Sequence, residues 1–221
     1  MTLDEALAQL ERRGQQQVRR LNVRDGAGAN QFGVKLGDIR AIAKTIKSDH
    51  ELGSELWRTG NLDAMLLATL ILKPSLLQPE ELEAMVSRVE VMQLADWLTS
   101  YVVKQHPAKE ALRVQWMEAG DPMLARAGWS LTAERVAKNP EGLDFDALLD
   151  RLDREMGGAP PPTRWTMNCC LAEIGIRSAA HRERAIAIGE RLGLYRDYPT
   201  SRGCVSPYAP IWIREMVSRR G

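Results

Sequence analysis

The stretch from Leu62 to Leu72 reads LDAMLLATLIL and decides the fold class of this chain. Its residues are apolar nearly all the way round a helical wheel, with no polar stripe that could face water. A helix of this kind must be covered by neighbouring elements on several sides. The stretch therefore predicts a helix buried among other helices.

The flanking sequence repeats the helical signal and lacks convincing strand patterns. Apolar residues recur at helical spacing from Leu94 to Val102 and from Phe145 to Met156, and no period-2 alternation is bounded by hairpin turns. Prolines break the chain into segments of about 12–20 residues, the length of ordinary globular helices. The breaks fall at Lys73-Pro74, His106-Pro107, Asp121-Pro122, Asn139-Pro140 and Tyr198-Pro199.

A Trp–Gly pattern that occurs twice in the sequence indicates a helical repeat. Trp57 is followed by Gly60 and then by the apolar stretch, and Trp116 is followed by Gly120 and the segment from Pro122. In both places a Trp ends one helix and a Gly turns the chain into the next. Stacked helix pairs of this kind form an α-solenoid with a concave face.

Composition narrows the class of protein. The 221 residues are 44% hydrophobic and include three cysteines, two of them adjacent, which cannot form a disulfide framework. No apolar run is long enough to cross a membrane, and no Cys/His cluster has zinc-ligand spacing. We therefore expect a cytoplasmic protein with no membrane partner, no metal and no organic cofactor.

The charge is unevenly distributed along a chain whose net charge is +1. Residues 176–221 hold nine arginines against four acidic residues, and a second basic run holds Arg12, Arg13, Arg19, Arg20 and Arg24. Such patches suit contact with phosphates, and they equally fit solvated helix faces.

Two segments are rich in glycine or proline. Residues 24–33 (RDGAGANQFG) follow no strand, so we expect a flexible connection here in preference to a phosphate-binding loop. Residues 157–162 (GGAPPP) predict a stiff linker before the last helices, without marking a domain boundary.

Several motifs, in this order and spacing, resemble the bacterial DNA alkylation repair family of AlkD type. The resemblance covers roughly residues 32–191. Its motifs are FGVKLGDIRAIAK (32–44), LW (56–57) with DAMLLA (63–68), QLADW (93–97), MLARA (123–127) and WTMNCCLAEIG (165–175).

The resemblance implies an all-α fold, a right-handed α-α superhelix of HEAT-like helical repeats, as a single domain over residues 1–221. It also implies a monomer that binds double-stranded DNA, and a monofunctional DNA glycosylase that excises cationic N3- and N7-alkylated purines. The cationic base is already a good leaving group, so the barrier falls chiefly by electrostatic stabilisation of an oxocarbenium-like transition state.

The same resemblance assigns roles to two polar residues. Asp96 falls where the family has its catalytic aspartate, and its charge would stabilise the cationic sugar. Arg126 falls where the family has an arginine that faces DNA, where it would hold a phosphate. The alternatives are structural: Asp96 would cap or pair with a neighbouring helix, and Arg126 would form an inter-helix ion pair, for which Asp96 is one candidate partner.

The chain departs from the family at the two aromatic walls of the site. Met92 and Cys169 stand where the family has tryptophans. Trp165 lies one helical turn from Cys169 and Trp129 lies three residues after Arg126, so these rings are candidates to contact DNA instead. Tryptophans on apolar helices are usually core residues, which is the competing interpretation.

Three functions remain open at this stage. They are an alkylpurine DNA glycosylase, a non-catalytic relative that binds unusual or branched DNA, and a helical scaffold that binds protein. The lost tryptophans favour the second, whereas the acid favours the first, because an acid facing phosphates weakens simple binding.

Overall fold

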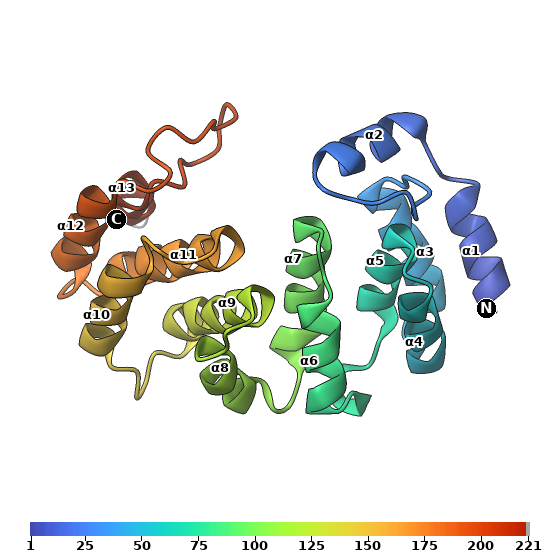
Figure 1. Cartoon of the computed structure of the whole chain (residues 1–221), viewed down its shortest axis with the longest axis horizontal. Helices are drawn as coiled ribbons and strands as arrows, with labels where there is room; N and C mark the ends of the chain where they lie inside the picture. Colours follow the sequence, from blue (N-terminus) through green and yellow to red (C-terminus); the bar gives the residue numbers. More distant parts are fainter. Residues whose placement is uncertain (220–221) are drawn as a thin grey trace. The chain divides into compact units, whose positions relative to one another are not determined.

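The computed structural model describes residues 1–219, and within them the chain is all-helical, with thirteen α-helices, two short 3-10 helices and no strand (Figure 1). Contacts divide the chain into two compact units, Met1–Lys109 and Glu110–Gly221. We refer to them as unit 1 and unit 2 and describe each by itself. The single domain expected for residues 1–221 stays a prediction.

Unit 1 is built around α5, the apolar stretch of the sequence analysis. This helix packs against α3, α4 and α7, and eight of its ten residues are buried. The helix buried among neighbours that the sequence predicts is thus confirmed. The elements of unit 1 are α1 (Leu3–Glu11), α2 (Gln16–Arg24), α3 (Leu36–Ile46), α4 (His50–Arg58), α5 (Leu62–Ile71), η1 (Pro74–Leu76), α6 (Pro79–Ser87), α7 (Met92–Tyr101) and η2 (Val103–Gln105).

Unit 2 is built around α9 and α11, two helices of 17 residues that make the most extensive helix pair of the chain. Helices α10, α12 and α13 cover α11, and Leu149, Leu171 and Ile213 meet in the core that results. The elements are α8 (Lys109–Met117), α9 (Pro122–Lys138), α10 (Phe145–Glu155), α11 (Pro161–Arg177), α12 (Arg182–Leu192) and α13 (Ala209–Ser218).

The two copies of the Trp–Gly pattern also have similar helix caps. Asn61 accepts hydrogen bonds from the backbone N–H groups two and three residues ahead at the start of α5. Asp121 accepts the corresponding two bonds at the start of α9. Both residues satisfy N–H groups that the first helical turn leaves without partners. The pairs α4–α5 and α8–α9 are therefore built alike.

The glycine-rich connection at residues 24–33 is held more firmly than expected. The carboxylate of Asp63, fully buried near the start of α5, accepts hydrogen bonds from the backbone N–H groups of Phe32, Gly33 and Val34 at 2.6, 3.0 and 2.9 Å. These N–H groups bind a carboxylate of the protein itself, so the end of the connection is a fixed turn. The expectation of a flexible connection is wrong for this end.

Candidate nucleic-acid interface

Helix α2 is a cationic helix that contributes almost nothing to the core. None of its residues is buried, and only Val18 and Asn22, one turn apart, are partly covered. The face turned away from this pair carries Arg20 and Arg24, and Arg19 lies between the two faces with its stem against Gly33. A helix with so little apolar burial is held in place by other means.

Polar contacts and one glycine hold α2 against the rest of unit 1. The N–H of Gln15 donates to the carbonyl of Gly33 at 2.9 Å, and the Asn22 amide donates to Gln31 at 2.8 Å. Gly33 has a φ of +79°, and a Cβ atom there would lie 2.3 Å from Cγ of Arg19. The turn fixed by Asp63 therefore also sets the position of α2.

The arginines at this end of unit 1 are nearly all without acidic partners. Within residues 1–219, no carboxylate contacts Arg12, Arg13, Arg19 or Arg20, and Arg24 pairs with its neighbour Asp25 at an exposed position. Exposed side chains of one charge sign, grouped on α2 and on the two residues after α1, attract polyanions. This is the cationic surface of the chain that is best suited to bind phosphates.

Most of the arginines after residue 176, unlike most of those of α2, have acidic partners or donate to backbone carbonyl groups. Arg184 of α12 binds Asp146 and Asp150 of α10, and Arg191 binds Asp153 of the same helix. Such pairs link the helices and neutralise the charge that the sequence suggests. Further pairs join Arg177 to Glu173, Arg214 to Glu190 and Arg219 to Glu215.

Two more arginines of this region donate to backbone carbonyl groups: Arg182 to that of Gly175 and Arg196 to that of Glu190. Arg202 has no acidic partner among residues 1–219, and Arg220 lies outside the described residues. The solvated-face interpretation thus fits most of the C-terminal arginines, and the phosphate interpretation fits the N-terminal ones.

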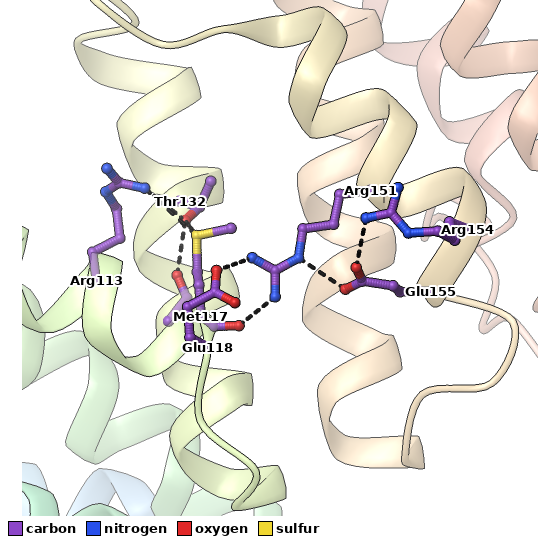
Figure 2. A network of polar contacts seen from close by, with 8 residues as sticks. Arg113, Met117, Glu118, Thr132, Arg151, Arg154 and Glu155 are labelled. Atoms are coloured by element: carbon purple, nitrogen blue, oxygen red, sulfur yellow. Dashed lines mark hydrogen bonds and ion pairs between the residues drawn. The ribbon is translucent and has the colours of Figure 1, made fainter.

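Arg151 organises a polar network inside unit 2. Its guanidinium binds Glu118, Glu155 and the carbonyl oxygen of Met117 (Figure 2). The same guanidinium lies 5.4 Å from the centroid of the Trp129 ring. The network fastens α10 to the end of α8, which is a structural task.

Trp129 is buried in this structure, with 1% of its surface exposed. Its ring belongs to the core of unit 2 and lies under Arg151. A ring covered in this way does not reach a DNA strand. The core interpretation therefore describes Trp129 better than the predicted DNA contact.

Arg126 lies on α9 and is 5% exposed. One of its Nη atoms donates to the carbonyl oxygen of Pro162 at the start of α11, at 3.1 Å. The guanidinium thus helps to join the two long helices of unit 2. Its predicted role as a phosphate clamp stays a prediction.

Asp96 lies on α7 of unit 1 and its side chain is exposed. The next residue, Trp97, points into unit 1 and carries the guanidinium of Arg40 over its ring at 4.5 Å. Met92, one turn before Asp96, is partly covered. The acid is therefore accessible, and a cationic side chain of α3 is fixed beside the neighbouring ring.

Trp165 is the centre of an aromatic cluster in unit 2. Its ring lies 5.3 Å from that of Tyr195 and 5.7 Å from that of Tyr198, measured between centroids. Cys169, one turn along α11, is partly exposed. The loop that carries the two tyrosines is distant in sequence, so the residues of α11 alone could not have revealed this cluster.

The second cysteine of the adjacent pair is not a nucleophile. Cys170 is fully buried, and burial raises the pKa of its thiol far above the ordinary value, so the thiolate is scarce at neutral pH.

Within the described part of the chain, no three His, Cys, Asp or Glu side chains are grouped to hold a metal ion, and no helix could span a membrane.

Fold and surface together define a HEAT-like helical-repeat protein with a cationic helix at one end of unit 1. The family model described as "DNA alkylation repair enzyme" matches residues 4–213. The chain therefore belongs to the DNA alkylation repair family, as the sequence motifs indicated.

Two relatives illustrate the likeness. An uncharacterized protein of Listeria innocua, Lin0241, is 27% identical over 192 residues, which cover 85% of this chain and 84% of the relative. A solved structure from a new family of proteins related to the HEAT-like repeat DNA glycosylases, with affinity for branched DNA structures, matches with a TM-score of 0.82. At 24% identity it covers 100% of this chain and 95% of its own, and it confirms the predicted all-α fold of HEAT-like repeats.

Proposed function

We propose that this chain is a DNA-binding protein of the alkylation repair family and that the arginines of α2, with Arg12 and Arg13 just after α1, hold the DNA backbone. The observation that supports this is the contrast between Arg19 and Arg20, which no carboxylate contacts, and the paired arginines of α12. Phosphate binding by unpaired cations releases condensed counterions, which makes the affinity steeply dependent on salt. Cations already paired with carboxylates release fewer.

The test compares two double variants with the same change in net charge. Arg19→Gln with Arg20→Gln removes two unpaired charges, and glutamine keeps the Cγ atom that packs against Gly33. Arg184→Gln with Arg191→Gln is the matched control on α12, where both arginines have acidic partners. Fluorescence anisotropy would measure the binding of labelled duplex and branched DNA over a range of salt concentrations.

We expect the first variant to bind both DNAs more weakly and to lose about 1.8 from the slope of log K against log salt, the contribution of two phosphate contacts. The control should keep a slope close to that of the wild type. An equal loss in both variants, or no loss in the first, would contradict the proposal. A preference for the branched DNA would extend to this chain the affinity described for the matched structure.

A second candidate, excision of cationic N3- and N7-alkylated purines, is favoured by the exposed carboxylate of Asp96. The carboxylate would stabilise positive charge on the sugar while the cationic base departs as a neutral base with the electrons of the glycosidic bond; water then adds to the sugar carbon and releases a proton to solvent. The family resemblance assigns this role to the position, and the accessible side chain is compatible with it.

Base release from duplexes that contain 7-methylguanine or 3-methyladenine tests this second candidate. The wild type should release the base, and Asp96→Asn should bind equally well but release it at least about 100-fold more slowly. Asp25→Asn, which alters another exposed carboxylate of unit 1, is the matched control. Salt-sensitive binding without any release by the wild type would leave DNA binding as the function and remove the glycosylase.

A further inference from the structure

The loop between α12 and α13 forms an open pocket against α11. The pocket has a volume of ≈ 290 Å³, and Trp165, Tyr198, Pro199, Pro207 and Trp212 provide most of its walls. This volume lies just below the range for small-molecule sites, which runs from about 300 to 1,000 Å³. Flat rings therefore line a space suited to one small planar group.

The exposed ring of Tyr198 is held in position before any ligand arrives. Tyr198 is 48% exposed, yet its ring contacts Trp165 at 5.7 Å and Tyr195 at 6.0 Å between centroids. The contact with Tyr195 is edge-to-face and the contact with Trp165 is tilted, and offset or edge-on arrangements of aromatic rings are favourable. An exposed ring that is already fixed loses little conformational freedom when another ring stacks on it.

The backbone at Tyr195 is strained in a way that serves this arrangement. Its φ is +61°, in the left-handed region that side-chain-bearing residues rarely occupy. This turn follows the end of α12 at Gly193 and brings both tyrosines back onto Trp165. The strain is maintained by the aromatic contacts, and strain of this kind is concentrated at functional sites.

The surroundings of the pocket are cationic. Arg202 is exposed on the loop and no carboxylate among residues 1–219 contacts it, whereas the guanidinium of Arg196 lies over the Tyr208 ring, 5.5 Å from its centroid. Arg164, the residue before Trp165 on α11, is partly exposed. An anionic ligand backbone could therefore pass beside the pocket while an uncharged ring enters it.

From these observations we infer that the pocket binds an unstacked nucleobase, one that DNA presents at a bulge, gap or branch point. The inference rests on the proposed DNA-binding function and adds to it a binding site for unpaired bases. Aromatic stacking supplies affinity for a base of any sequence, because every base has a π-face. Paired bases within a duplex are stacked on each other and offer no free face.

A proline-rich peptide is the other ligand that aromatic walls accept. Such peptides need an extended groove that follows several residues, and they gain nothing from surrounding arginines. A compact pocket with cationic surroundings favours a base attached to a phosphate backbone. The experiment below separates the two ligands.

The test measures binding to two DNA duplexes of equal length, one fully paired and one with a single extrahelical base. The wild type should bind the bulged DNA about tenfold more tightly, a difference that corresponds to about 1.4 kcal/mol. Tyr198→Ala should abolish this preference while leaving the affinity for the paired duplex unchanged. Tyr198→Phe, which keeps the ring, should restore it, and Val114→Ala on α8 serves as an exposed apolar control.

A direct readout comes from the indole N–H signals of Trp165 and Trp212 in a ¹H–¹⁵N spectrum. Both signals should shift on addition of the bulged DNA and stay in place with the paired duplex. Equal affinity for the two DNAs in the wild type, or an equal loss of both in Tyr198→Ala, would overturn the inference. Shifts produced by a proline-rich peptide but not by the bulged DNA would also overturn it.

The experiment gives different results if the pocket does not bind a base and if the chain does not bind DNA at all. If the pocket has no role, the wild type still binds both DNAs in a salt-sensitive way that depends on Arg19 and Arg20. If the chain does not bind DNA, neither duplex binds at low salt, and no variant has any effect.

Discussion

Replacing Asp63 with Ala tests how the glycine-rich turn and α2 are held. Asp63 is fully buried and accepts three backbone N–H groups, of which those of Gly33 and Val34 are buried. A buried N–H without a partner costs about 1–3 kcal/mol, and the partly solvated N–H of Phe32 costs less. The loss of a negative charge from the first turn of α5 adds about 0.3–1 kcal/mol.

The expected loss is therefore about 4 kcal/mol from the free energy of unfolding of unit 1. This is a large share of the 5–15 kcal/mol that is typical of a folded domain. Urea unfolding followed by circular dichroism would measure it, and amide hydrogen exchange would report the opening of residues 28–34. Faster exchange should extend into α2, because Gly33 accepts the hydrogen bond from Gln15 that holds the start of this helix.

The matched control is Asp25→Ala, which removes an acid from the same end of unit 1. Asp25 is exposed and pairs with the exposed Arg24, so the cost should stay below about 1 kcal/mol. The reasoning would be refuted if Asp63→Ala cost less than about 1 kcal/mol. It would be refuted equally if amide exchange in residues 28–34 matched that of the wild type.

Three further predictions concern the turn, the polar network and the buried thiol. Gly33→Ala should destabilise unit 1 by at least about 1 kcal/mol more than Gly26→Ala in urea unfolding, because both have positive φ but only Gly33 lacks room for a Cβ atom. Burial alone would raise the pKa of Glu155. Hydrogen bonds from Arg151 and Arg154 outweigh this effect and hold the pKa of Glu155 below the ordinary 4.5. The stability from Glu155 is thus present above pH 4.5 and lost as the pH falls through the lowered pKa, and Arg151→Gln should flatten this dependence in urea midpoints measured from pH 7 to 3. Cys170 should react with a thiol reagent only at the rate at which unit 2 opens, and a rapid reaction in the native protein would contradict its burial.

Features that depend on nearby residues could be predicted from the sequence. The apolar stretch, the helical spacing and the proline breaks are local signals, and they correctly indicated an all-α chain. Helix α9 begins at Pro122 after the Asp121 cap, and α5 ends just before the break at Pro74. The order of motifs also identified the family, which the match over residues 4–213 confirms.

The sequence by itself therefore determined the helical class, several helix limits and the family, because hydrogen bonds and caps within a helix join residues at most about four apart. It did not place the start of α11, because Pro161 and Pro162, predicted as linker, form its first turn. Only the tertiary structure decided which charges are neutralised and which rings are exposed. Arg184 meets its acidic partners on another helix, more than 30 residues earlier, and Asp63 meets the turn at residues 32–34. Trp129 and Trp165 both lie on largely apolar helices, yet packing places one in the core and leaves the other beside an open pocket. These contacts join residues of different helices and depend on how the helices pack. The spacing of apolar residues within one helix therefore does not predict them.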